Sequence, residues 1–147
     1  MRTIEAGIDT VCYMCSLTGK QKSEIISELK MLPHFQTEYG DYFENTYDYT
    51  SRAFAKQGIK LRLYRFRGSV WTLFVILHPA RLMGNTDRSA LFQPAKGELK
   101  KMQNQADTVL KQIKFPVKIH KMKLCRVDLT VNLSFESQSM VEQYLRI

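Results

Sequence analysis

Three side chains able to do chemistry stand at alternate positions of one strand-like stretch, residues 124–135. Asp128, Thr130 and Asn132 offer a carboxylate, a hydroxyl and an amide in turn. Side chains two residues apart on a strand point to the same face, about 6.5 to 7 Å from each other. Such a row of oxygen ligands suits a metal ion or a phosphate group. An ordinary solvated strand face has the same composition, and this alternative stays open.

The other positions of the same stretch are apolar. They are Cys125, Val127, Leu129, Val131, Leu133 and Phe135. Strict alternation of apolar and polar residues predicts a long strand with one face in a core. We therefore expect Val131 to be buried, and a charge placed there to unfold the domain.

The charge of the chain favours a polyanionic partner. The 147 residues have 22 basic and 14 acidic side chains, for a net charge of +8. Residues 1–50 hold four of the basic and eight of the acidic side chains, so the excess of positive charge lies in residues 51–147. A basic body of this kind most often binds nucleic acid, because each phosphate contact releases counterions. A basic protein without such a partner remains the alternative.

Three cysteines give no disulfide framework. Cys12 and Cys15 form a C-x-x-C pair, but no second cysteine pair completes a zinc site, and no helix start follows as in a redox motif. We interpret them as buried thiols of a cytoplasmic protein. No signal peptide is recognised, and no apolar run is long enough to span a membrane.

The elements that must position the polar row are predicted from periodicity. The order is strand, helix, strands including a hairpin, helix, strand and helix. The first strand is residues 4–17; Thr18 and Gln21 then match a capping box at the start of a helix that ends before Pro33. Further helices are expected at residues 95–113 and 137–147. This order predicts a single α+β domain over residues 1–147, with a largely antiparallel, ferredoxin-like sheet and helices packed on it.

A hairpin is predicted at residues 60–67 and 70–77. The second strand is apolar on both faces, which indicates a central strand covered on both sides. The first strand carries Lys60, Arg62, Arg65 and Arg67. Burying four cations would be costly, so we expect this strand at or near an edge of the sheet, with its charges facing solvent or phosphate.

A metal-assisted site is the best-supported chemistry, because phosphate-binding glycine loops and hydrolytic motifs are absent. Asp128 would anchor the ion, with Asn132 or His78 beside it. His78 directly follows the second hairpin strand, although a histidine at a strand end is also often structural. A further carboxylate is expected from the aromatic and acidic segment 34–54, where the candidates are Asp41, Glu44 and Asp48. Such hard oxygen ligands suit Mg²⁺ or Mn²⁺.

The run R-V-D-L-T-V-N from Arg126 to Asn132 resembles a strand with the pattern R-[IL]-D-[LV]-x-x-[DN]. That strand is found in rolling-circle replication initiators of plasmids, filamentous phages and integrative elements. The opening run from Gly7 to Val11 and the arginine-rich hairpin are also similar to the N-terminal half of that family. The chain departs from the family pattern in two respects. It lacks the paired histidines of the best-known nicking enzymes, and no tyrosine stands out as a nucleophile.

The resemblance implies a DNA-binding domain that nicks one strand with a tyrosine and a divalent metal held on the sheet. Asp128 would organise the metal, and Tyr144 on the last helix would be the candidate nucleophile, with core packing of that tyrosine as the alternative. The expected contacts to the DNA backbone are Arg62, Arg65, Arg67, Lys121, Lys123 and Arg126.

Two other functions remain open. A non-catalytic nucleic-acid-binding module would use the same cations without a metal, and a protein-interaction subunit would use its acidic first third to dock a basic surface. The last helix has no glycine or proline stop signal, so we expect the natural chain to continue beyond Ile147 and residues 1–147 to form the N-terminal domain.

Overall fold

The structure, a computed structural model, describes residues 3–35, 42–49, 52–65, 70–87, 89–113 and 118–145. Within these ranges, only the backbone is described for residues 3, 32–35, 42–49, 52, 53, 113 and 144.

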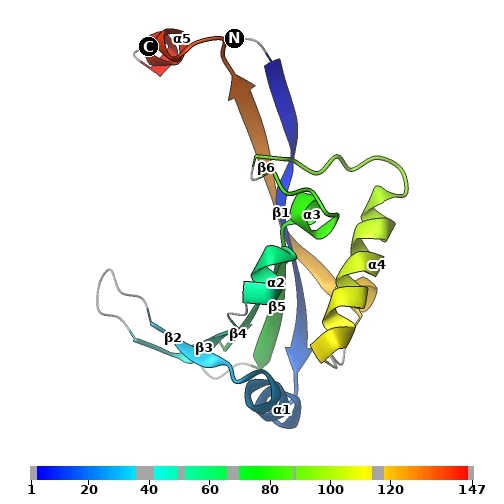
Figure 1. Cartoon of the computed structure of the whole chain (residues 1–147). Coiled ribbons are helices and arrows are strands. Elements are labelled where there is room, and N and C mark those ends of the chain that lie inside the picture. The colour runs from blue at the N-terminus through cyan, green and yellow to red at the C-terminus, as the bar shows by residue number, and fades with distance from the viewer. Residues whose placement is uncertain are drawn as a thin grey trace.

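The described strands form one six-stranded sheet in the order β2-β3-β4-β5-β1-β6 (Figure 1). Every neighbouring pair is antiparallel. With the helices, this confirms the predicted α+β class with a largely antiparallel sheet. The strands are β1 (Thr3–Leu17), β2 (Leu32–Phe35), β3 (Tyr42–Tyr49), β4 (Ile59–Tyr64), β5 (Trp71–Leu77) and β6 (Lys123–Ser134).

The helices follow local signals that are visible in the sequence. Helix α1 begins at the predicted capping box, in which the Thr18 hydroxyl accepts from the Gln21 N–H and the Gln21 side chain accepts from the Thr18 N–H. Pro79 occupies the first turn of the short helix α3, where its missing N–H costs no hydrogen bond. The helices are α1 (Gly19–Leu29), α2 (Arg52–Lys56), α3 (Pro79–Leu82), α4 (Glu98–Leu110) and α5 (Gln138–Leu145), with short 3₁₀ turns η1 (Lys111–Ile113) and η2 (Ile119–Lys121).

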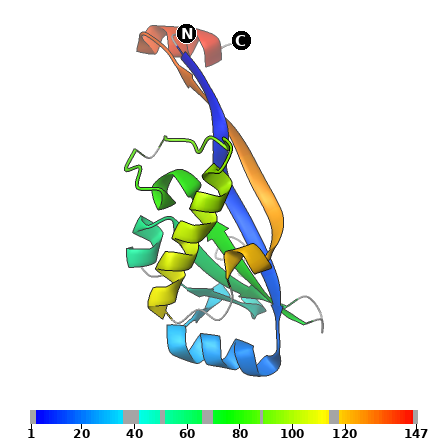
Figure 2. The same cartoon turned by 90° about the vertical axis from the view of Figure 1, so that its right-hand side faces the viewer.

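The core lies on one side of the sheet. Leu73, Val75 and Leu77 alternate along β5 and are fully buried, and the residues opposite them on β4 and β1 point to the same side. Helices α1 to α4 each contribute buried residues to this one apolar cluster; Met102 and Ala106 of α4 are fully buried. Figure 2 shows α2, α3 and α4 together on this side of the sheet. The opposite face is called the open face below.

The prediction that the first hairpin strand lies at or near an edge is wrong. Strand β4 pairs with β3 on one side and with β5 on the other, so it is internal. Lys60 is exposed and Arg62 is half-buried on β4, whereas Leu61 and Leu63 are fully buried. The cations are tolerated because one face of an antiparallel sheet can remain in contact with water.

β5 is the central strand that the sequence predicts, but it is not fully covered on both sides. Phe74 and Ile76 on its open face are half-buried, in contrast to Leu73, Val75 and Leu77, which alternate with them and are fully buried. The turn between β4 and β5 lies outside the described residues. The acidic and aromatic segment contributes the backbone of β2 and β3 and leads into α2.

The prediction that the apolar face of β6 lies in a core is also wrong. Val127, Leu129, Val131 and Leu133 are 42, 79, 58 and 39% exposed. The end of β6 and the start of β1 run together as a two-stranded arm away from α2–α4, with α5 at its tip (Figure 1). Alternation shows that one face of a strand is apolar, but burial also requires a layer above that face, and these exposures show that no described element supplies one.

We therefore expect Val131→Asp to leave the fold intact, because the new carboxylate would remain in water. Its free energy of unfolding should change by about 1 kcal/mol or less, the span of strand preference at exposed positions. Val75→Asp is the matched control, since the same change at a fully buried position leaves an unpaired charge in the core and should prevent folding. Circular dichroism and urea unfolding measure both. Equal loss of folded protein would contradict the exposed position of Val131.

Candidate functional site

The register of the sheet places several of the predicted site residues on the open face. Directly opposed residues of an antiparallel pair share a face, and Thr10 and Cys12 of β1 oppose Asp128 and Arg126 of β6. Cys12 in turn opposes Ile76 of β5, two residues before His78. Arg62 of β4 opposes Phe74, again on the open face.

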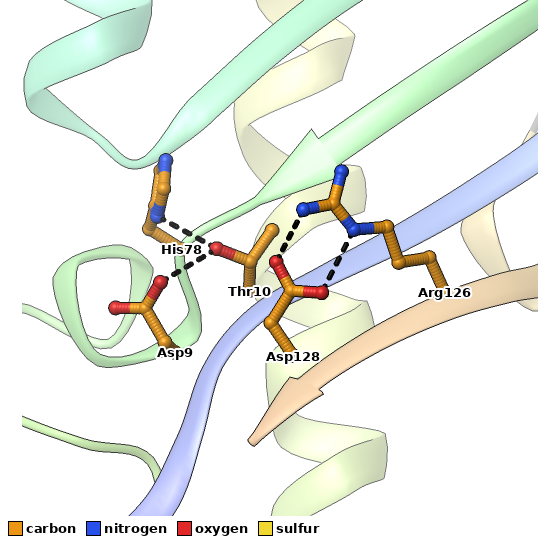
Figure 3. Close-up of polar contacts among 5 residues, drawn as sticks. All are labelled: Asp9, Thr10, His78, Arg126 and Asp128. Atoms are coloured by element: carbon orange, nitrogen blue, oxygen red, sulfur yellow. Dashed lines mark hydrogen bonds and ion pairs between the residues drawn. The ribbon is translucent and has the colours of Figure 1, made fainter. Parts of the chain in front are cut away.

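A polar cluster lies where these strands meet (Figure 3). The Thr10 hydroxyl donates to Oδ2 of Asp9 at 2.9 Å, and its Oγ1 lies 3.4 Å from Nδ1 of His78. Asp128 is the residue opposite Thr10 on the neighbouring strand. Two carboxylates, an imidazole and a hydroxyl thus come from β1, β6 and the residue that follows β5 to one place on the sheet. We call Asp9, Thr10, His78 and Asp128 the polar cluster.

A bulge in β1 sets the position of Asp9. The pairing of β1 with β6 shifts between Ile8 and Thr10, so Asp9 has no direct partner on β6. On the other side of β1, β5 reaches only as far as Val11, and Ile8 instead makes two backbone hydrogen bonds with Phe92. Bulges commonly redirect a side chain near a functional site. Here the bulge allows Asp9 and Thr10, which are adjacent in sequence, to contact each other through their side chains.

Gly58 fixes the position of His78. The His78 N–H donates to the Gly58 carbonyl at 2.8 Å, and the His78 carbonyl accepts the first helical bond of α3 from Leu82 at 2.9 Å. Gly58 has φ +80°, and a Cβ there would lie 2.7 Å from the His78 carbonyl oxygen. Only glycine fits this close approach with this backbone conformation. The imidazole is therefore held on a backbone anchored on both sides.

The hydrogen bonds of Thr10 favour one tautomer of His78. A hydroxyl has a single proton, and that of Thr10 is donated to Asp9. Nδ1 of a neutral His78 is then the donor toward the Thr10 oxygen, which leaves Nε2 with its free lone pair. Nε2 is the atom able to accept a proton or to bind a metal.

Arg126 and Asp128 form a bidentate ion pair on β6. Nε of Arg126 donates to Oδ1 of Asp128 at 2.8 Å, and NH2 donates to Oδ2 at 2.6 Å. The Arg126 side chain is 63% exposed and that of Asp128 is 33% exposed. The hydrogen bonds from Arg126 hold the pKa of Asp128 below its ordinary value of 3.8, and the charge of His78 acts in the same direction. Asp128 is therefore a carboxylate at neutral pH.

The donor set fits a hard divalent cation only in part. Mg²⁺ and Mn²⁺ prefer carboxylate oxygens and are commonly held by one or two carboxylates together with water and substrate phosphates. Asp9, Asp128 and Nε2 of His78 are ligands of suitable chemistry. Among the residues that the structure describes, however, no three His, Cys, Asp or Glu side chains are grouped closely enough to hold a metal ion. Both oxygens of Asp128 are also occupied by Arg126.

The other predicted metal ligands do not join the cluster. Asn132 lies four residues beyond Asp128 on β6, about 13 Å along the strand, and its amide donates to the Ser89 carbonyl at 2.6 Å. Glu44 and Asp48 lie on β3, four strands from β6, which is about 19 Å across the sheet. Their side chains and the whole of Asp41 lie outside the described residues. The second carboxylate is Asp9, to which the sequence drew attention only through the family-like run from Gly7 to Val11.

The predicted DNA-contacting cations occupy different places. Arg126 and Arg62 lie on the open face, on β6 and β4, and Lys121 and Lys123 are exposed just before and at the start of β6. The Arg65 guanidinium lies 5.3 Å from the centre of the Trp71 ring, on which Lys22 also stacks at 4.7 Å. Arg67 lies outside the described residues.

The predicted nucleophile is not brought to the cluster. Tyr144 belongs to α5, which lies at the tip of the two-stranded arm, apart from the helices that pack on the core (Figure 1). Its side chain is outside the described residues, so its packing on an apolar stripe stays a prediction. We do not include Tyr144 in the site.

The cysteines do not form a metal site. Cys12 lies on the open face and Cys15 opposes Leu73 on the core face, so the two thiols of the C-x-x-C pair point to opposite sides of β1. Burial raises the pKa of Cys12 to about 12, helped by a hydrogen bond with Cys125. Burial also raises the pKa of Cys15. Both thiols therefore stay protonated at neutral pH, as expected of thiols buried or half-buried in a sheet.

Comparison with known proteins gives no relative. No family model matches the chain, and neither the curated proteins nor the solved structures contain a match. Within the described residues, no helix is long and apolar enough to cross a membrane.

The anchoring of His78 can be tested with Gly58→Ala, and Gly84→Ala is the matched control. Both glycines have positive φ, at +80° and +91°, but a Cβ at Gly84 would meet nothing within 4 Å. Gly84→Ala should therefore lower the free energy of unfolding by about 1 to 2 kcal/mol, from the strain of a positive φ at alanine alone. Gly58→Ala should lower the free energy of unfolding by about 1 to 3 kcal/mol more than Gly84→Ala does, because the added Cβ overlaps His78 and Leu82. Equal losses in urea unfolding would mean that the close approach at Gly58 has no cost.

The ion pair can be tested by measuring the pKa of Asp128 by NMR titration of its side-chain carbon. Arg126→Gln should raise this pKa toward the ordinary value, because it removes the largest cause of the lowering. Since the folded pKa lies below the unfolded one, the pair stabilises the fold above pH 3.8, and this contribution is lost as the pH falls through the folded pKa. Lys123→Gln removes a charge from the same strand and should leave the pKa of Asp128 nearly unchanged. A similar rise in both variants would contradict a specific pair.

Proposed function

We propose that this chain is a DNA-binding domain of the replication-initiator type, which uses the open face of its sheet to bind a single strand and its polar cluster for metal-assisted cleavage of a phosphodiester. The observation that carries the proposal is the meeting of Asp9, Thr10, His78 and Asp128 on one face of the sheet, beside Arg126. The same acid, Asp128, is central to the family-like motif in the sequence.

The side chains around the cluster support a single strand as the substrate. Phe74 and Ile76 lie half-buried in the middle of the open face, between Arg62 on β4 and Arg126 on β6. An apolar platform flanked by cations suits nucleic acid whose bases are unstacked, because bases can lie on the platform while phosphates meet the cations. A duplex keeps its bases stacked inside and gains only the phosphate contacts.

The chain's own residues have separate roles in this proposal. Asp128 and Asp9 would hold a Mg²⁺ or Mn²⁺ ion, which would neutralise charge that develops on the scissile phosphate. In this proposal, Nε2 of His78 would ligate that ion or accept a proton from the attacking hydroxyl of water or a tyrosine, as its oxygen bonds to phosphorus and an oxygen of the DNA backbone leaves. Arg126 would bind a phosphate next to the cluster, and Thr10 keeps Asp9 and His78 in position through its hydroxyl.

A second candidate function is nucleic-acid binding without catalysis. It is favoured by the occupation of both Asp128 oxygens by Arg126, and by the lack of a preformed three-ligand group in the described part of the chain. In this case the same open face would bind single strands, and Asp128 would only orient Arg126.

The test uses labelled single-stranded, hairpin and duplex DNA of one sequence, with and without Mn²⁺, on native and denaturing gels. We expect single-stranded DNA to bind more tightly than duplex, with log affinity falling against log salt by about 0.7 per phosphate contact. We also expect a Mn²⁺-dependent cut in the single-stranded or hairpin DNA. Asp128→Asn should abolish the cut without weakening binding.

The outcomes separate the functions. Salt-dependent binding without a cut would favour the non-catalytic module, and cleavage retained in Asp128→Asn would remove Asp128 from the mechanism. Binding that does not respond to salt would contradict both nucleic-acid functions and leave the protein-interaction subunit.

A further inference from the structure

The backbone hydrogen bonds of Ile8 show which groups of β6 face the outer edge of the sheet. The N–H and the C=O of Ile8 both bond to Phe92, on the side of β1 away from β6. Directly opposed residues of an antiparallel pair direct these groups either toward each other or away from each other. Leu129 opposes Ile8, so its N–H and C=O point away from β1, to the outer edge. Every second residue in the regular part of β6, residues 126–134, does the same; these outward residues are Val127, Leu129, Val131 and Leu133.

This outer edge is not protected against pairing. The four outward residues also carry exposed apolar side chains, whereas Asp128, Thr130 and Asn132 between them are half-buried. From Arg126 to Ser134 the strand has no proline, lysine or bulge, the devices that usually keep an edge strand from pairing. Its only two charges, on Arg126 and Asp128, neutralise each other. Within the described part of the chain, no segment hydrogen-bonds to this edge.

The two-stranded arm has contacts on its other sides. Along the β1 edge, the Gln93 side chain donates to the Ala6 carbonyl at 2.7 Å. On the open face, a Cβ added at Gly7 would lie 2.8 Å from Cβ of Leu91, so the segment 91–93 packs directly on the arm. A two-stranded ribbon is marginally stable in water, and a further strand makes it stable. The β6 edge is the side on which the arm can gain that strand.

We infer that a second copy of this chain pairs with β6 as an antiparallel strand, about a two-fold axis at Thr130. The inference does not depend on the proposed function. The axis places Thr130 opposite Thr130 of the second copy, Leu129 opposite its Val131, and Val127 opposite its Leu133. The last two kinds of pair join outward residues, so each exchanges two backbone hydrogen bonds across the axis.

The length of the ladder and the charges select this register. An axis at Thr130 pairs the whole of residues 126–134, and any other centre leaves part of this stretch unpaired. An axis at Asp128 or at Arg126 would also place two like charges opposite each other, which is unfavourable. With the axis at Thr130, the apolar face gains contacts between aliphatic side chains, and the open face gains a threonine pair, which is favourable across strands. An isologous contact of this kind supplies the missing strand to both copies at once.

The pairing would join the two six-stranded sheets into one continuous sheet. Because the axis is perpendicular to the sheet, the open faces of both copies would lie on the same side. Asp128 of one copy would oppose Asn132 of the other, so the two Asp128 residues would be about 14 Å apart along the ladder. The polar clusters of both copies would thus border the joint.

The first test measures the mass of the whole chain by analytical ultracentrifugation over a series of protein concentrations. The wild type should pass from monomer to dimer and form no larger species. Leu129→Lys should weaken the dimer about tenfold or more, because it places an ammonium group opposite an apolar residue at two symmetric positions. Val131→Pro should weaken it similarly, because it removes an outward N–H that the monomer does not use. Circular dichroism checks that each variant is folded.

Ile4→Lys is the matched control. Ile4 is 61% exposed on the same apolar face of the arm, but it lies on β1 opposite Leu133, one strand away from the edge that pairs. Its dimer should therefore be as stable as that of the wild type.

The second test checks the register by disulfide cross-linking with diamide in a Cys125→Ser background, which removes the exposed native thiol. Thr130→Cys should form a covalent dimer, because the two new thiols would face each other across the axis. Ser134→Cys is the control on the same strand. Its two thiols would be eight residues apart along the ladder, about 27 Å, and should not cross-link.

Three results would overturn the inference. A wild type that stays monomeric at every concentration has no such contact. If Ile4→Lys weakens the dimer as much as Leu129→Lys, the copies associate through the apolar faces of their arms and not through paired strands. If Thr130→Cys cross-links no better than Ser134→Cys, the two-fold axis does not lie at Thr130.

Discussion

The hydrogen-bonded ladder of β1 is the constraint on which the rest of the structure depends. This fifteen-residue strand pairs with β6 along most of its length, but with β5 only from Val11 onward. Where β5 ends, Phe92 takes over the hydrogen bonds of Ile8. Asp9 lies in the interval between these two partners, and the bulge there places Asp9 and Thr10 beside the end of β5, where His78 stands. The polar cluster is thus a consequence of a change of partner along one strand.

The difference between the two faces of the sheet explains where cations and carboxylates can lie. On the core face, the described helices α1–α4 cover the sheet, and the central residues of β4 and β5 are fully buried and apolar. On the open face, water remains near, so Lys60 and Arg62 have little desolvation cost even on the internal strand β4, as does Arg126 on the edge strand β6. A charged residue in an antiparallel sheet therefore indicates which face of the sheet is in contact with water. It does not indicate whether its strand is internal or at an edge.

The sequence predicts the positions of the helices and strands better than it predicts which residues are buried and which strands pair. Periodicity located β1, α1, α4 and β6, because these signals depend on local geometry. It failed for the burial of Val131 and for the edge position of β4, because both depend on which elements pack or pair with a strand. These are properties of the tertiary structure. The same distinction applies to the site. His78 and Asp128 were named from the sequence, but Asp9 depends on a bulge that no spacing rule indicates.

The rigidity of the polar cluster gives the Arg126–Asp128 contact its importance. The His78 backbone is hydrogen-bonded to Gly58 and Leu82, and Thr10 is buried between its two hydrogen-bond partners and β6. Arg126, by contrast, is 63% exposed, and its guanidinium contacts the half-buried Asp128 on the same edge strand. A ligand that approaches the open face meets groups whose positions are already set, except for one guanidinium. A change in the Arg126 side chain on ligand binding therefore requires no movement of the core.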